Sequence, residues 1–146
     1  MAFPGGMREP SDATLRATAQ RETREEVALD LAEGRYVRAQ PRVLSVSHGN
    51  ASPLVIEPHL YRLSGPRPAL EGNREVASTL WVPIAFLRDR TNRDSMVYER
   101  SRLPMRFACY RYEGKVIWGL TLRMIDDLLA RPLPGSSEAR ARTAGG

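Results

Sequence analysis

The feature that most constrains this 146-residue sequence is a Gly-Gly pair followed by a long run of helix-forming residues. Gly5 and Gly6 permit a tight backbone turn, because glycine has no side chain to obstruct it. Residues 12–27 have good helix propensity and include neither glycine nor proline. Ser11 or Asp12 is a suitable N-cap for that helix. The sequence therefore predicts a turn followed by a helix over residues 12–27.

Three glutamates share one face of this predicted helix. Glu22, Glu25 and Glu26 stand at positions i, i+3 and i+4, a spacing that brings side chains together on a helix. Because like charges repel, a positive group should compensate them. Mg²⁺ prefers oxygen ligands and often lies between carboxylates and substrate phosphates. Arg21 can orient one carboxylate through a forked hydrogen bond, and the amides of Gly5–Gly6 are available for a phosphate.

The rest of the chain alternates between strand and helix signals, which indicates a mixed α/β domain over residues 1–130. Pro83 should open a short helix through Leu87. A last helix is expected over residues 121–130. A Pro-, Gly- and Ser-containing stretch, 131–146, has the composition of a disordered tail. The expected strands are Arg42–Ser47, Leu54–Leu63, Glu75–Val82, Arg106–Tyr112 and Lys115–Trp118.

Composition and charge argue against several other classes of protein. The formal net charge is +5, but the 21 arginines and one lysine are scattered, and aromatic residues are only 7%. Nucleic-acid surfaces normally combine clustered basic residues with aromatic stacking platforms, so a nucleic-acid partner is not expected. No apolar run approaches the roughly 18–20 residues of a membrane-spanning helix. With one cysteine and no signal-peptide pattern at the start, a soluble cytoplasmic protein is expected.

The stretch Phe3–Leu31 resembles the Nudix box, whose usual form is G-x5-E-x7-R-E-U-x-E-E-x-G-U, with U aliphatic. Here Gly6 is followed after five residues by Asp12, and after eight more by Arg21-Glu22-Thr23-Arg24-Glu25-Glu26. The FPGG opening, the longer spacer, the Asp and the non-aliphatic Thr23 are similar to the coenzyme A diphosphatase branch of the family. Ala28 stands where the box usually has glycine, a residue that eases a left-handed helix end.

Two later segments extend the resemblance over most of residues 3–130. Glu75-Val76 followed by Trp81-Val82-Pro83 looks like the glutamate and WVP segment that many Nudix proteins carry after the box. By that similarity Glu75 is a candidate general base or an additional metal ligand. The stretch 116–129 is similar to the strand and helix that end the coenzyme A-type proteins.

The resemblance implies a Nudix-type α/β/α sandwich with a mixed sheet, and a hydrolase that cleaves a small-molecule diphosphate with Mg²⁺ or Mn²⁺. Coenzyme A or an acyl derivative is the implied substrate, giving 3′,5′-ADP and a 4′-phosphopantetheine product. The implied roles fall on residues of this sequence. Glu22, Glu25 and Glu26 would bind metal; Glu25, Glu75 and Arg21 would act in catalysis; Gly5, Gly6 and Arg8 would contact the substrate phosphates.

The start of the chain leaves alternatives open. Nudix domains normally have several tens of residues before their FPGG, whereas this sequence has two. We therefore expect a domain that is short at its N-terminus, with exposed strand edges that favour pairing with a second chain, as in a homodimer. The alternatives are a Nudix hydrolase of ADP-ribose or another nucleoside diphosphate derivative, a catalytically inactive Nudix-like binding module, and an RNA-binding role for the basic charge.

Overall fold

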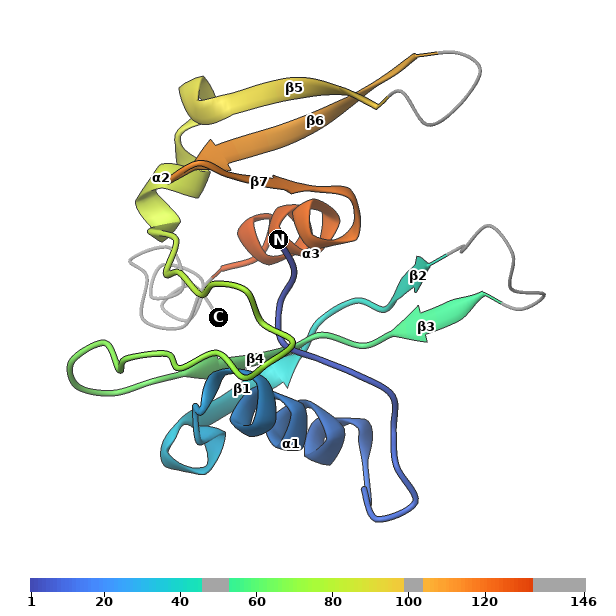
Figure 1. Cartoon of the computed structure of the whole chain (residues 1–146), viewed down its shortest axis with the longest axis vertical. Coiled ribbons are helices and arrows are strands. Elements are labelled where there is room, and N and C mark those ends of the chain that lie inside the picture. The colour runs from blue at the N-terminus through green and yellow to red at the C-terminus, as the bar shows by residue number, and fades with distance from the viewer. Residues whose placement is uncertain (46–52, 99–103, 133–146) are drawn as a thin grey trace, which may run out of the picture. The chain divides into compact units, whose positions relative to one another are not determined.

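The computed structural model describes residues 1–45, 53–98 and 104–132 (Figure 1). The chain divides into two compact units. One unit comprises residues 2–81, and the other comprises Met1 with the segment that begins at Val82. The predicted disordered tail, 131–146, lies outside the described residues from position 133 onward. In the described parts, none of the helices combines the length and the hydrophobicity that crossing a membrane would require.

The described part of the 2–81 unit contains one long helix and two small sheets. A short 3-10 helix, Leu31–Glu33, follows the long helix. Strand β1 pairs with β4, and β2 pairs with β3, both antiparallel. The element bounds are α1 Leu15–Val27, β1 Arg35–Ala39, β2 Val43–Ser45, β3 Leu54–Ile56 and β4 His59–Arg62.

Helix α1 begins later than the sequence predicts. Its N-cap is Thr14, whose Oγ1 accepts a hydrogen bond from the Ala17 amide at 3.1 Å. The expectation of a cap at Ser11 or Asp12 is wrong, because the Asp12 side chain is buried in an interaction with Arg21 instead. The helix ends at Val27 as predicted, with Ala28 in the left-handed region at φ 55°.

Arginine–aromatic contacts attach α1 to the β1–β4 sheet. The Arg16 guanidinium lies 4.1 Å from the centroid of the Tyr36 ring, and its Nε donates to the Tyr61 hydroxyl at 3.0 Å. Tyr36 and Tyr61 are a cross-strand pair in the register of β1 and β4, and their rings meet edge to face. A cation over an aromatic face is attracted by the ring quadrupole, so these contacts hold the helix on the sheet.

The predicted strand Leu54–Leu63 is broken into β3 and β4 at Glu57-Pro58. Proline has no amide hydrogen and interrupts a ladder, although the Pro58 carbonyl still accepts from the Gln40 amide at 2.7 Å. The expected strand Glu75–Val82 is not formed, and this prediction is wrong. The amides of Glu75 and Val76 are hydrogen-bonded to the Asn73 side chain, so they cannot donate to a neighbouring strand.

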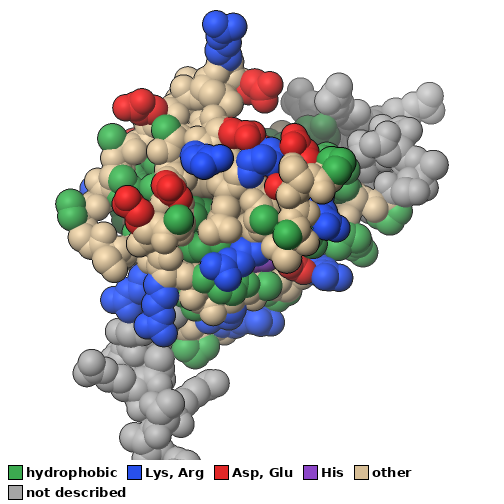
Figure 2. Space-filling model, turned by 90° about the horizontal axis from the view of Figure 1, so that it is seen from below, with side chains coloured by type: hydrophobic (Ala, Val, Ile, Leu, Met, Phe, Trp, Pro, Cys, Tyr) green, Lys and Arg blue, Asp and Glu red, His purple; other side chains and the backbone are tan. Residues whose placement is uncertain are grey.

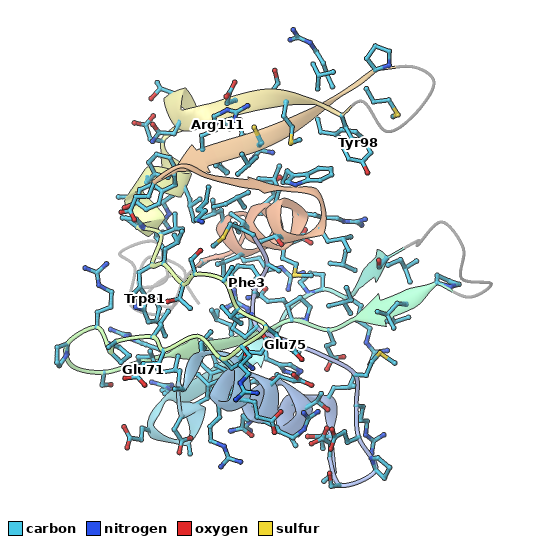
Figure 3. The ribbon with its side chains drawn as sticks, in the orientation of Figure 1. Phe3, Glu71, Glu75, Trp81, Tyr98 and Arg111 are labelled. Atoms are coloured by element: carbon cyan, nitrogen blue, oxygen red, sulfur yellow. The ribbon has the colours of Figure 1, made fainter. Side chains whose placement is uncertain are left out.

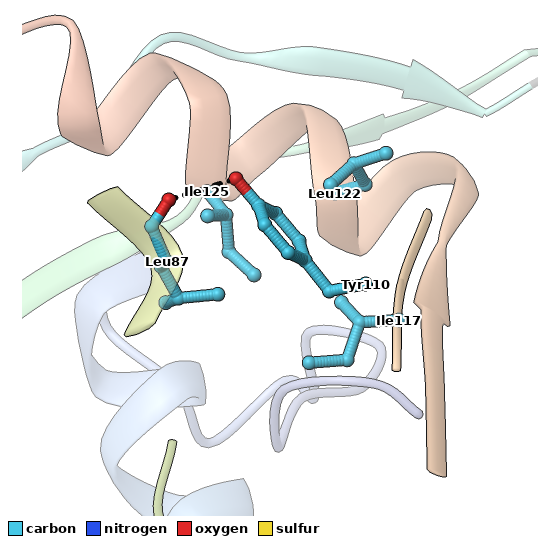
Figure 4. Close-up of a cluster of buried hydrophobic side chains, with 5 residues drawn as sticks. All are labelled: Leu87, Tyr110, Ile117, Leu122 and Ile125. Carbon is cyan, nitrogen blue, oxygen red and sulfur yellow. Dashed lines mark hydrogen bonds between the residues drawn. The ribbon is translucent and has the colours of Figure 1, made fainter. Parts of the chain in front are cut away.

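In the described part of the second unit, two α-helices and a short 3-10 helix, Arg90–Asn92, accompany a three-stranded antiparallel sheet of order β5-β6-β7. Tyr110 is 3% exposed and donates from its hydroxyl to the Leu87 carbonyl at 2.8 Å, at the centre of a buried cluster (Figure 4). The other cluster members are Leu87, Ile117, Leu122 and Ile125. The element bounds are α2 Ile84–Arg88, β5 Arg93–Tyr98, β6 Met105–Tyr112, β7 Lys115–Trp118 and α3 Gly119–Leu129.

The mixed α/β class expected from the sequence is confirmed. The predicted hairpin between β6 and β7 is present, and its turn residues Glu113 and Gly114 both have positive φ. The helices predicted at 83–87 and 121–130 correspond to α2 and α3. Strands β1 and β5 were not predicted. Every described strand pair is antiparallel, whereas a mixed sheet was expected.

Candidate active site

Two of the predicted metal ligands lie against the Gly-Gly turn. Glu22 and Glu26 are one helical turn apart on α1. The Gly5 amide donates to Glu26 Oε2 at 3.2 Å. Gly6 faces the carboxylate of Glu22 so closely that a β-carbon at position 6 would overlap it. The turn and two carboxylates of the acidic helix face therefore lie side by side, and their common role as a site stays a prediction.

Arg21 is the central cation of this acidic cluster. Its Nη1 lies 3.0 Å from Glu22 Oε1 and 3.1 Å from Glu25 Oε2, and its Nη2 donates to the Met7 carbonyl at 3.1 Å. The side chain is 15% exposed. The hydrogen bond to Asp12, opposed by burial and reinforced by Glu22, raises the pKa of Arg21 above its ordinary value. Arg21 thus bridges two of the box glutamates and the preceding loop.

Asp12 supports Arg21 from the opposite side. The carboxylate is 6% exposed and accepts hydrogen bonds from Arg21 Nη2 at 3.1 Å and from the Glu9 amide at 3.0 Å. These two bonds, Arg21 first, lower the pKa of Asp12 from its ordinary 3.8 to about 2. A carboxylate that accepts charged and backbone donors in this way is ionised across the physiological range. Sequence reasoning had placed Asp12 as a helix cap and missed this role.

Arg8 is already engaged with the backbone. Its Nε donates to the Asp12 carbonyl at 3.0 Å, and its Nη2 donates to the Ala13 carbonyl at 3.3 Å. The side chain therefore closes the loop that leads into α1. Its predicted contact with substrate phosphates stays a prediction.

Glu75 lies on a loop that is hydrogen-bonded to the end of the same helix. The Asn73 amide donates to the Glu26 carbonyl, and the Glu71 amide donates to the Val27 carbonyl, both at 3.1 Å. Figure 3 shows Glu71 and Glu75 on this loop beside α1. Glu75 is exposed. The loop that contains Glu75 is thus attached to the end of α1. The catalytic role of Glu75 stays a prediction.

Hydrogen bonds between its own residues also hold this loop. Trp81 Nε1 donates to the Pro68 carbonyl at 3.0 Å, and Thr79 Oγ1 donates to the Leu70 carbonyl at 3.2 Å. Neither these bonds nor the link to α1 could be read from residue spacing. The Asn73-Arg74-Glu75 sequence offered one signal, because asparagine side chains commonly bind backbone amides two or three residues ahead.

The oxygen donors beside the Gly-Gly turn suit a divalent cation. Glu22 and Glu26 supply two carboxylates, and Mg²⁺ is commonly held by one or two carboxylates with substrate phosphates and water. Glu25 instead lies on Arg21 and is 51% exposed. Across residues 1–45, 53–98 and 104–132, no three acidic, histidine or cysteine side chains are arranged to hold an ion alone. The residues therefore fit an ion that takes further ligands from phosphate and water.

Acidic and basic side chains share one face of the protein (Figure 2). They lie close together there, with basic groups gathered towards one edge of that view.

Comparison with known proteins identifies the family of the chain. Residues 1–100 match the NUDIX domain. The chain is 29% identical over 128 residues to the uncharacterized Nudix hydrolase NudL of Yersinia pestis (strain Pestoides F), and equally to NudL of Yersinia pseudotuberculosis serotype O:1b (strain IP 31758). Each alignment covers 88% of this chain and 62% of the relative, so the chain spans about three fifths of the length of these curated relatives. With the domain match covering more than half of its residues, the chain belongs to the Nudix family.

Proposed function

We propose that this chain hydrolyses the diphosphate linkage of a small molecule with Mg²⁺ or Mn²⁺. The observation that carries the proposal is the meeting of Glu22 and Glu26 with the Gly5–Gly6 backbone. Two carboxylates beside a glycine turn suit a cation and the phosphate oxygens that it neutralises. The NudL relatives are named Nudix hydrolases, which supports the same class of reaction.

Each residue of the site has a distinct role in this proposal. Glu22 and Glu26 would hold the metal ion, with Glu25 as a third ligand or helper. Arg21 would fix the direction of the Glu22 carboxylate, to which it is paired at 3.0 Å. The backbone of Gly5 and Gly6 would allow the phosphates to approach closely.

Water is the nucleophile in the proposed reaction. A new P–O bond forms to the water oxygen while the bridging P–O bond breaks, and the proton of the water passes to Glu75 or a box glutamate. A bound divalent cation supplies charge neutralisation on the phosphate oxygens and lowers the pKa of the water. Most of the rate enhancement in phosphoryl transfer comes from such positioning and electrostatics.

We further propose coenzyme A or an acyl-coenzyme A as the substrate. The FPGG opening, the eight-residue spacer after Asp12 and the polar Thr23 support this branch of the family. Hydrolysis would give 3′,5′-ADP and a 4′-phosphopantetheine product.

The test is turnover of coenzyme A by the full chain with Mn²⁺ or Mg²⁺, followed by chromatography of the products. Glu26→Gln should abolish turnover. Glu33→Gln is the matched control, because Glu33 is an exposed glutamate in the short helix after α1, outside the site. The expected result is 3′,5′-ADP formation by the wild type and by Glu33→Gln only.

Two results would contradict the proposal at different levels. Turnover of ADP-ribose without turnover of coenzyme A would reject the substrate and keep the reaction. Folded protein that binds Mn²⁺ but hydrolyses neither compound would reject the reaction and favour a binding module.

A further inference from the structure

The turn around Asn73 connects the proposed base to a proposed metal ligand. The Asn73 amide donates to the backbone carbonyl of Glu26 at 3.1 Å. The Asn73 side-chain oxygen, Oδ1, accepts from the Glu75 amide at 2.9 Å and from the Val76 amide at 3.2 Å. Asn73 is therefore hydrogen-bonded both to the end of α1 and to the backbone of Glu75.

These bonds define where Glu75 can lie. Asn73, Arg74 and Glu75 are all exposed, so burial does not fix the loop at this point. The turn is nonetheless tight, because a β-carbon at Gly72 would lie 2.9 Å from the Val76 carbonyl oxygen. The hydrogen bonds of Asn73 therefore constrain the backbone that carries the Glu75 carboxylate.

We propose that Asn73 is a positioning residue. It holds Glu75 in a fixed position relative to the end of α1 that carries Glu22 and Glu26. The inference rests on the proposed function, since it assigns to Glu75 the proton of the attacking water. A general base must be within hydrogen-bond reach of the proton that it takes. A displacement of about 1 Å can cost on the order of 100-fold in rate, so loss of the Asn73 side chain should lower turnover without any direct contact with substrate.

The proposal distinguishes Asn73→Ala from Asn73→Asp. Alanine removes the side-chain acceptor of the Glu75 amide, while the Val76 amide keeps its 3.3 Å bond to the backbone carbonyl of residue 73. We expect kcat to fall by about 10-fold to 100-fold with KM changed little. Aspartate keeps a side-chain oxygen in the same position and should restore most of kcat. Thr79→Val is the matched control, because it removes a different hydrogen bond of the same loop, that to the Leu70 carbonyl.

A double-mutant cycle with Glu75→Gln provides the decisive test. If Asn73 acts through Glu75, the two substitutions act as a unit, and Asn73→Ala should lower kcat no further in the Glu75→Gln background. A residue that only stabilises the fold would lower kcat by the same factor in both backgrounds.

The outcomes separate this inference from the proposed function. A wild type that hydrolyses neither coenzyme A nor ADP-ribose rejects the proposed function and with it the role of Asn73. An active wild type rejects only the inference if Asn73→Ala retains wild-type kcat, if Thr79→Val is equally impaired, or if the effects of Asn73→Ala and Glu75→Gln multiply.

Discussion

Gly5 and Gly6 are neighbours in the sequence with different surroundings. A β-carbon at Gly5 would meet no atom of the described residues within 4 Å, whereas one at Gly6 would overlap the Glu22 carboxylate. The obstructing atoms are the end of a flexible side chain, so Gly6→Ala should leave the fold intact and displace Glu22. We expect Gly6→Ala to weaken Mn²⁺ binding by about 10-fold to 100-fold, the usual effect of disturbing a ligand's orientation.

Isothermal titration with Mn²⁺ measures this difference directly. Gly5→Ala is the control, because its amide keeps the hydrogen bond to Glu26 and its new methyl group points into open space. Equal Mn²⁺ affinity in the two alanine variants would show that metal binding does not depend on the position of Glu22 beside Gly6.

Asp12 makes the stability of the chain sensitive to acid. Its pKa is about 2 in the folded protein and 3.8 ordinarily. A carboxyl group whose pKa is lower in the folded than in the unfolded protein stabilises the fold at pH values above the unfolded pKa. This contribution is lost as the pH falls through the folded pKa. The contribution should therefore be complete above pH of about 5 and disappear between about pH 4 and pH 2.

Urea unfolding at several pH values tests this expectation against Asp12→Asn. The wild type should be the more stable protein at pH 7, and the gap between the two midpoints should narrow as the pH is lowered towards 3. A gap that stays constant over this range would contradict the ionised Asp12–Arg21 pair as its source.

At the scale of the element, α1 ends at a strained position. Ala28 adopts φ 55° and ψ 26°, and its amide donates to the Arg24 carbonyl at 3.1 Å. A left-handed residue other than glycine costs roughly 1–2 kcal/mol, while glycine loses roughly 0.5–1 kcal/mol through its greater freedom when unfolded. Ala28→Gly should therefore increase the free energy of unfolding by about 0.5–1 kcal/mol.

The matched control is Ala19→Gly in the interior of the same helix. There the backbone is helical, so glycine should lower the free energy of unfolding by about 1 kcal/mol. Chemical unfolding followed by circular dichroism gives both values. Destabilisation by Ala28→Gly would mean that the helix ends differently in solution.

Local sequence signals identified the elements whose structure depends on neighbouring residues. The end of helix α1 at Val27 was predictable, although its start was not. The β6–β7 hairpin was also predictable, because its Glu113-Gly114 turn matches the twist of the strands. Strand β1 was missed because Arg35 and Arg38 interrupt its apolar pattern and its register shifts between Tyr36 and Arg38. An apolar alternation of period two cannot be recognised across such a bulge.

The candidate site also has a part that the local sequence predicts and a part that it does not. The shared face of Glu22 and Glu26, the Arg21 pairing and the glycine turn all follow from spacing within 21 residues, and sequence reasoning reached them. The links from Asn73 to Glu26 and from Glu71 to Val27 join segments more than 40 residues apart. Their partners are backbone carbonyls, which every residue possesses, so side-chain identity alone cannot reveal them.

At the scale of the whole molecule, the two tryptophans report on different units. Trp81 ends the 2–81 unit, and Trp118 ends strand β7 in the other unit. The proposed metal ligands lie only in the 2–81 unit. A ligand that binds the folded state stabilises it by about 2.7 kcal/mol at 100 times its Kd. For a chain of this size that corresponds to a rise in Tm of roughly 5–10 °C.

Trp118→Phe leaves Trp81 as the fluorescent reporter, and Trp81→Phe leaves Trp118. We expect saturating Mg²⁺ to raise the Tm reported by Trp81, and Glu22→Gln with Glu26→Gln to remove that rise. If both reporters shift together, the two units unfold as one cooperative body. If only Trp81 shifts, they unfold separately, and metal binding stabilises the 2–81 unit alone. An unchanged Tm at Trp81 would contradict metal binding by Glu22 and Glu26, because a ligand bound to the folded unit must raise its stability.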